Sequence, residues 1–350
     1  MKSSFVLLAC ALAATSCSVI GADDDDLESA AEAGGEVVLV THESFARPDE
    51  VVAAFEEETG YELVLRATGD AGTLTNKLVL TADNPTGDVA FGVDNTFASR
   101  ALEGGAFASH EFDAPDGVDD YALPGDDDHA LTAVDNANVC VNVDDTWFAA
   151  EGLAPPETFA DLADPAYEDL FVLPSAVTSS VGLSFLLATI DEYGDGWTDY
   201  WSDLVDNGAK LTSGWSEAYQ GDFTQGGGKG NRPVVLSYDS SPAFTVDGLG
   251  GTTTSALLET CFRQVEYAGV LAGAANPEGA EALVEFLVGP EVQAALPDSM
   301  YVFPVVDGTP LPEEWASFAV QPTDPHELDP AEVAANRDEW LSEWRDITTG

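Results

Sequence analysis

Basic residues are scarce in this chain. Of 350 residues, 11 are lysine or arginine and 64 are aspartate or glutamate, which gives a formal net charge of −53 at pH 7. No basic patch is present to meet phosphates, so the composition argues against nucleic-acid binding. The acidic residues recur along the whole sequence, and their repulsion would destabilise a compact state in dilute salt. Because molar salt shortens the screening length to about 3 Å, we expect a halophilic protein with an acidic surface, with an ordinary acidic protein as the alternative.

The usual signatures of catalysis and metal binding are also missing. The sequence has no phosphate-loop motif, since the glycine-rich stretch 226–230 precedes a predicted strand and not a helix. It has no G-x-S-x-G elbow, and its four histidines lack the spacing of metal ligands. We therefore expect a protein that is not an enzyme and has no metal or cofactor. A cell-surface hydrolase is the alternative from another class, and it would need a nucleophile and base that the sequence does not show.

The single early hydrophobic run is short. Residues 5–14 follow Lys2, are too few to cross a bilayer, and precede Thr15, Ser16 and Cys17. This pattern predicts a signal peptide with a lipobox over residues 1–17, in which Cys17 is lipidated and becomes the mature N-terminus. A plain cleaved signal peptide with an incidental Cys17 is the alternative. Residues 18–35 are small and acidic and predict a tether, so we expect an extracytoplasmic protein held on the outer face of the cell membrane by lipid alone.

Cysteine is equally sparse. Cys10 lies in the predicted signal peptide and Cys17 at its end, which leaves Cys140 and Cys261 in the body of the chain. An exported protein meets an oxidising compartment, so a disulfide between these two is possible. Two buried free thiols are the alternative, because sequence spacing does not establish proximity.

The remaining sequence alternates between strand and helix patterns. Apolar β-branched runs at 36–41, 61–67 and 88–93 alternate with helical patterns at 49–60, 74–81 and 97–104, and a second such round follows. The alternation predicts an α/β fold with parallel sheets, arranged as two lobes with a ligand cleft between them. The predicted divisions are lobe 1 at 36–137 plus 264–312, lobe 2 at 138–263, and a C-terminal segment at 313–350. That segment carries an amphipathic helix at 332–347, with Trp340 and Trp344 on one face.

Aromatic and hydroxyl side chains gather at the predicted strand ends. The aromatic residues are Trp215, Tyr238 and Tyr301, and the hydroxyls are the pairs Ser179–Ser180 and Ser240–Ser241. Aromatic faces together with a carboxylate suit a flat organic cation.

At these positions the chain resembles a known family. Gly214 to Tyr219 (Gly-Trp-Ser-Glu-Ala-Tyr) and Val235 to Phe244 (Val-Leu-Ser-Tyr-Asp-Ser-Ser-Pro-Ala-Phe) are similar to segments of the thiamine-binding proteins of thiamine ABC transporters. Shorter similarities occur in the same order at 42–45, 92–95, 264–266 and 340–345, and the resemblance covers about residues 37–347 in a haloarchaeal-like version. It implies the type II periplasmic-binding-protein fold, a solute-binding role in transport, thiamine and its phosphates as ligands, an ABC transporter permease as partner, and a monomer.

The resemblance also implies a set of ligand-binding residues. They are Asp70 and Ala71 in the loop after the second strand, Ser179 and Ser180 at a helix start, Trp215, and the run Tyr238, Asp239, Ser240 and Ser241. Asp70 and the rings would hold the cationic thiamine, and the serine hydroxyls, at a helix N-terminus that favours anions, would accept a phosphate. The chain departs from the family pattern at four implied site positions, namely His42 and Phe244 in place of Tyr, Tyr301 in place of Trp, and Ala71 in place of Gly.

A related binding protein for ferric iron, or for another small cationic or phosphonate ligand, is the alternative within the binding class. Ferric receptors usually supply adjacent tyrosines as ligands, whereas Tyr238 is followed by Asp239.

Overall fold

The computed structural model describes residues 34–46 and 48–349. The predicted signal peptide, Cys17 and nearly all of the predicted tether therefore lie outside the described residues. Within the described part, no helix combines the length and apolar character needed to cross a bilayer.

The first α/β round forms one end of a mixed sheet. Strand β1 pairs in parallel with both β2 and β3. Four of its five buried residues are apolar, and the fifth is Thr41. The first helix stops at Gly60, whose φ of 76° supplies the left-handed turn that ends many helices. The elements are β1 (Glu36–Thr41), α1 (Asp49–Thr59), β2 (Glu62–Ala67), α2 (Ala71–Leu80), β3 (Val89–Asp94) and α3 (Ala98–Glu103).

The second round forms the other end of the sheet, where β5 pairs in parallel with β6 and β7. Helix α6 is buried along nearly its whole length, because its sequence is apolar or small on all sides. The elements are α4 (Asp145–Glu151), α5 (Phe159–Leu162), β5 (Phe171–Pro174), α6 (Ser180–Tyr193), α7 (Trp197–Asp206), β6 (Lys210–Thr212) and β7 (Val234–Tyr238).

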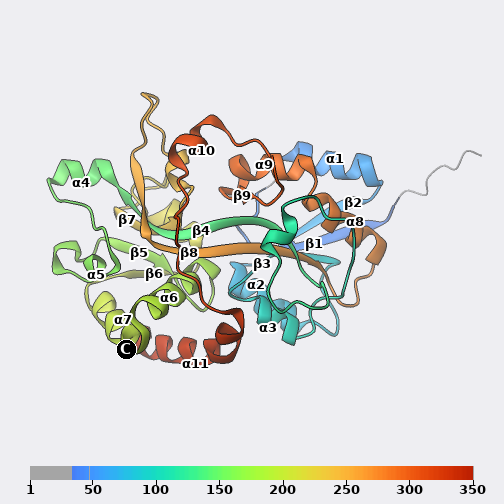
Figure 1. Ribbon diagram of the computed structural model, residues 1–350, viewed down its shortest axis with the longest axis horizontal. Helices are drawn as coiled ribbons and strands as arrows, with labels where there is room; N and C mark the ends of the chain where they lie inside the picture. Colours follow the sequence, from blue (N-terminus) through green and yellow to red (C-terminus); the bar gives the residue numbers. More distant parts are fainter. Residues whose placement is uncertain (1–33, 47, 350) are drawn as a thin grey trace, which may run out of the picture. The chain divides into compact units, whose positions relative to one another are not determined.

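Two long strands, β4 (Thr132–Asp144) and β8 (Thr254–Val270), connect the two ends. They pair antiparallel at the centre of the sheet, whose order is β2-β1-β3-β8-β4-β7-β5-β6, with β9 also paired to β4 (Figure 1). The sheet is therefore mixed, with the predicted parallel pairing within each α/β round and antiparallel pairing between the two long connecting strands. The predicted lobe boundaries fall in mid-strand, where Ala137 pairs with Gln264 and Asn138 with Arg263. The division into lobes at these points stays a prediction.

A disulfide joins these two strands, since Cys140 and Cys261 are bonded at an S–S distance of 1.98 Å. It lies where the register jumps, because Val139 pairs with Phe262 whereas Val141 pairs with Leu257. The amide of Val141 donates instead to the hydroxyl of Thr260 at 3.0 Å. The covalent bond thus holds an irregular part of the central strand pair.

The elements of the C-terminal part of the chain pack against both ends of the sheet. Helix α9 continues through Pro297 to Met300, and α4 and α10 are short helices. Helix α11 packs on α7, where the rings of Trp344 and Trp201 meet edge to face at 5.5 Å. The elements are α8 (Pro277–Leu287), α9 (Pro290–Met300), β9 (Phe303–Pro304), α10 (Glu313–Phe318) and α11 (Pro330–Thr349).

Candidate ligand-binding site

A pocket of about 180 Å³ lies where strand ends and helix starts from both ends of the sheet meet. It is lined by the segment after β1, the start of α2, the start of α6, the loop after β6, the end of β7, and the end of α9. Chains that leave the carboxyl ends of parallel strands gather at one edge of a sheet, which explains why residues distant in sequence meet here.

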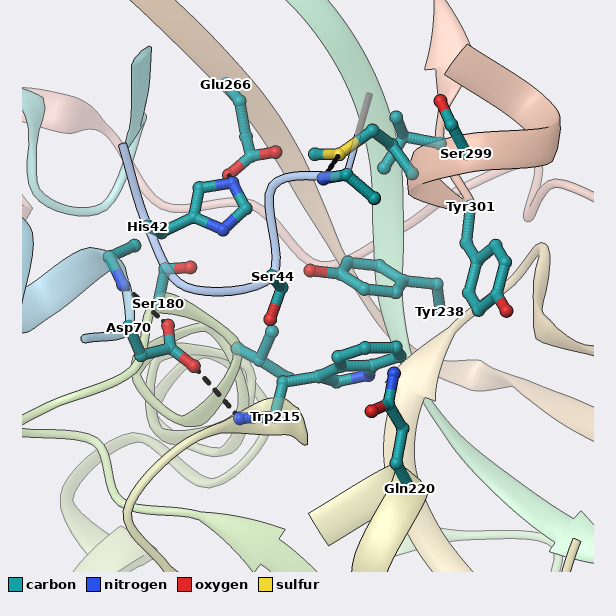
Figure 2. A pocket seen from close by; sticks show the side chains of 15 residues that line it. His42, Ser44, Asp70, Ser180, Trp215, Gln220, Tyr238, Glu266, Ser299 and Tyr301 are labelled. Carbon is teal, nitrogen blue, oxygen red and sulfur yellow. Dashed lines mark hydrogen bonds and ion pairs between the residues drawn. The ribbon is translucent and has the colours of Figure 1, made fainter. Parts of the chain in front are cut away.

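Asp70 connects two of these segments. Its Oδ1 accepts a hydrogen bond from the amide of Ala71 at 2.6 Å, so that it caps α2, and its Oδ2 accepts from the amide of Trp215 at 2.9 Å (Figure 2). Burial raises the pKa of this carboxyl, while the two amides act in the opposite direction. A Cβ at position 214 would lie 2.8 Å from Oδ2, so Gly214 permits this close approach.

Aromatic rings form one wall of the pocket. The indole of Trp215 stacks on Tyr219 at 5.1 Å, and its Nε1 donates to the hydroxyl of Ser237 at 2.9 Å. Tyr238 lies tilted to it at 6.2 Å and Tyr301 edge-on at 6.1 Å. The indole is thus fixed by packing on one face and by a hydrogen bond at its edge, which gives the pocket a rigid aromatic surface.

Tyr301 is held in a strained backbone conformation. Its φ of 66° places it in the left-handed region, which a bulky residue rarely adopts, directly after the last residue of α9. The hydroxyl of Ser240 donates to the Tyr301 carbonyl, and the ring lies against that of Phe244. These contacts hold the Tyr301 ring at the pocket.

His42 and Glu266 face each other at the other side of the pocket, with 3.6 Å between Nε2 and Oε1 (Figure 2). Burial lowers the pKa of His42 to about 4, so the imidazole is neutral at neutral pH. The ring fits because position 92 is glycine: a Cβ there would lie 2.1 Å from His42 Cδ2.

Two further buried carboxyls lie behind Glu266. Asp94 and Asp135 are paired with it across the adjacent strands β3 and β4. Burial raises the pKa of Glu266 and of Asp135, and each neighbouring acid raises that of Glu266 further. Both oxygens of Asp135 are buried without a hydrogen-bond partner. The raised pKa values favour the protonated forms of these carboxyls in the free protein, and a positive charge beside them would favour ionisation.

Seven of the predicted site residues line this pocket and five do not. Those that line it are His42, Asp70, Ala71, Ser180, Trp215, Tyr238 and Tyr301.

The other five support the pocket from outside it. Asp239 accepts a hydrogen bond from Asn138 Nδ2 at 2.7 Å, and Ser241 bonds to the hydroxyl of Ser237 at 2.8 Å, so their polar groups are satisfied within the chain. Ser179 is fully buried just before α6. Ser240 and Phe244 contact Tyr301, as described above. These five residues are not among those that line the pocket, and their direct contact with a ligand stays a prediction.

The sequence patterns missed several lining residues. The most important is Glu266, which lay within a short similarity to the family but was not assigned a role. The others that line the pocket include Ser44, Gln220, Ser299 and Met300. Within the described residues no group of three or more His, Cys, Asp or Glu side chains is placed to hold a metal ion.

The chain belongs to the bacterial extracellular solute-binding protein family, whose model matches residues 50–323. Solved structures of similar proteins confirm the type II periplasmic-binding-protein fold. A periplasmic thiamin binding protein matches with a TM-score of 0.79 at 30% identity, covering 89% of this chain and 96% of that chain. Iron-bound HitA from Pseudomonas aeruginosa shares the fold at a TM-score of 0.70 and 19% identity, over 89% of this chain and 99% of that chain.

Similar sequences are named as thiamine-binding periplasmic proteins. That of Escherichia coli strain K12 is 32% identical over 320 residues, which is 88% of this chain and 92% of that protein. That of Brucella melitensis biotype 1 is 32% identical over 337 residues, which is 92% of this chain and 95% of that protein.

The buried acids make stability depend on pH. Burial raises the pKa of Asp94 from 3.8 to about 7, so between about pH 4 and about pH 7 the unfolded chain loses a proton that the folded protein keeps, and the stability falls as the pH rises. We predict that Asp94→Asn makes this decline shallower by about 1.4 kcal/mol per pH unit. Denaturant unfolding at several pH values measures how the free energy of unfolding changes with pH. Asp298→Asn on the exposed side of α9 removes one charge as a control, and equal slopes for Asp94→Asn and the wild type would refute the assignment.

Proposed function

We propose that this protein is the extracytoplasmic substrate-binding component of an ABC importer and that it binds thiamine. One observation carries the proposal: aromatic rings and buried carboxyl groups converge on a single pocket. Trp215 and Tyr238 offer ring faces, and Asp70 and Glu266 offer carboxyls. Thiamine combines a flat aromatic ring with a second ring that carries a positive charge, and such a cation is attracted both to aromatic faces and to carboxylates. The names of the similar proteins support the same ligand.

The pocket geometry suggests how the ligand lies. The ring surface of Trp215 and Tyr238 would contact the thiamine rings, while Asp70 and Glu266 would face the positive charge. His42 stays neutral and so adds no repulsion to that charge.

The first turn of α6 offers a place for a phosphate. Ser180 and Val181 line the pocket there, and the first amides of a helix have no partner within it. Thiamine phosphates are therefore secondary ligands in our proposal, although Asp70 lies on the same pocket wall and would repel a phosphate. Parallel titrations with thiamine and with thiamine monophosphate test this extension. If thiamine binds and thiamine monophosphate does not, thiamine phosphates are rejected as ligands.

Ferric iron is not favoured as the ligand. A tyrosine that binds ferric iron does so as a phenolate, but burial and the nearby carboxyl groups raise the pKa of Tyr238 well above its usual value. The phenolate form that ferric iron requires is therefore disfavoured in the free protein.

The leader sequence and the composition suggest where the protein works. A lipid anchor at Cys17 would keep it on the outer face of the membrane, next to an importer permease. The net charge of −53 supports a site in concentrated salt.

The test of the ligand is calorimetric titration of thiamine into the wild type and two tryptophan variants, in multimolar KCl. We predict one-to-one binding by the wild type and at least about tenfold weaker binding by Trp215→Ala, because a stacked cation loses an aromatic face. Trp147→Ala on α4, outside the pocket, is the matched control and should bind like the wild type.

Circular dichroism in the same salt shows whether each protein is folded, and dialysis into dilute buffer should unfold the wild type if the protein depends on salt screening. A folded wild type that produces no heat with thiamine would reject thiamine as the ligand.

The anchor is tested by Cys17→Ser. We predict that the wild type is found with the membranes of the expressing cells and that the variant is released in soluble form, because the thioether-linked lipid requires the cysteine. Equal distribution of the two would favour a plain cleaved signal peptide.

A further inference from the structure

A second pocket, of about 370 Å³, lies between α3 and α11, apart from the proposed thiamine site. It contains an unusual share of the positive charge. The sequence has 11 lysines and arginines, and three of them, Arg100, Arg337 and Arg345, line this pocket. In a chain with so few basic residues, three arginines in one pocket are unexpected, and a function of the pocket itself would explain them.

Arg337 is buried without adequate partners. Its side chain is 4% exposed, and its Nη1 donates a 3.3 Å hydrogen bond to the hydroxyl of Ser99. Its Nε has no hydrogen-bond partner, and neither has the buried Nε of Arg100 on α3. A buried guanidinium that lacks partners is costly, and this cost would fall if an acceptor entered the pocket.

The carboxylates nearby do not balance this charge. Asp338 Oδ1 lies 3.8 Å from both Arg100 Nη1 and Arg337 Nε, and its side chain is 80% exposed. An exposed pair at this distance contributes little. Glu103 acts on Arg337 more weakly than Asp338 does. Burial lowers the pKa of Arg337, and Arg100 lowers it further, which is the signature of adjacent like charges.

The other polar groups of the pocket are suited to the same type of ligand. Asn76 of α2 can donate through its amide and Ser342 of α11 through its hydroxyl. Guanidinium groups present paired N–H donors that match the oxygens of phosphate and carboxylate. Asp338 is the one carboxylate on the lining and would have to stay turned to solvent.

We propose that the pocket between α3 and α11 binds an oxyanion of the phosphate class, held by Arg100, Arg337 and Arg345. The anion would join α3 to the C-terminal helix, which also packs on α7 through Trp344 and Trp201. This site does not depend on the identity of the ligand in the first pocket.

The experiment is calorimetric titration of inorganic phosphate into the intact chain at constant KCl concentration. We expect one saturable site in the wild type and binding about tenfold weaker or more in Arg100→Gln and in Arg345→Gln, because each loses a charge-assisted hydrogen bond. These two arginines are partly or largely exposed, so the variants should fold, and thermal unfolding in the same salt checks it. Arg66→Gln, exposed on β2 and outside the pocket, is the matched control.

Two results would overturn the proposal: no saturable phosphate binding by the folded wild type, or unchanged binding by both Arg100→Gln and Arg345→Gln. The second result would place the anion elsewhere, for example at the start of α6.

Phenyl phosphate as a second titrant identifies the source of the anion. Tighter binding than inorganic phosphate indicates an organic phosphate whose ring lies on Phe97 and Leu341, and equal binding indicates that the phosphate group alone is recognised.

Discussion

The hydrogen bonds of Asp70 join the separate parts of the chain that make the first pocket. One oxygen caps α2 and the other holds the amide of Trp215, which is 145 residues away in the sequence. The position of the indole, and through it the stacking with Tyr219 and the angle to Tyr238, therefore depends on one buried carboxylate. Gly214 is required beside it because any side chain there would collide with Asp70. The same carboxylate that organises the pocket is also available to a positively charged ligand.

The electrostatics of the pocket follow from burial. His42 is neutral, and the pKa values of Asp94, Asp135 and Glu266 are all raised, so the uncharged forms of these acids are favoured in the free pocket. A cation would reverse this by favouring the ionised carboxylate. The free protein thereby avoids the repulsion of several buried charges, and the bound state gains an ion pair in a place of low dielectric constant. The arginine pocket at α3 and α11 shows the opposite problem, a buried positive charge whose paired carboxylate, Asp338, is 80% exposed.

The sequence predicted the fold better than the site. Alternating strand and helix patterns are local, so they locate most elements. The start of β4 is harder to read from the sequence, because Asp135 and Asn136 interrupt its apolar pattern although both are buried in the structure. Motif similarity identified Asp70 and Trp215. It could not separate Tyr238, which lines the pocket, from Asp239, which turns to Asn138, since neighbours on a strand point to opposite sides. Glu266 was missed because its role depends on the strands beside it.

The central claim is that buried carboxyl groups recognise a cation, and the pH dependence of thiamine affinity tests it most directly. Burial raises the pKa of Glu266, and a bound cation would lower it, so binding releases a proton and the affinity should rise as the pH rises. Titrations of the wild type between about pH 6 and about pH 8 should show this rise, and those of Glu266→Gln should show weaker binding with a shallower dependence on pH. An affinity that is high but independent of pH, and the same in the wild type and Glu266→Gln, would contradict the account.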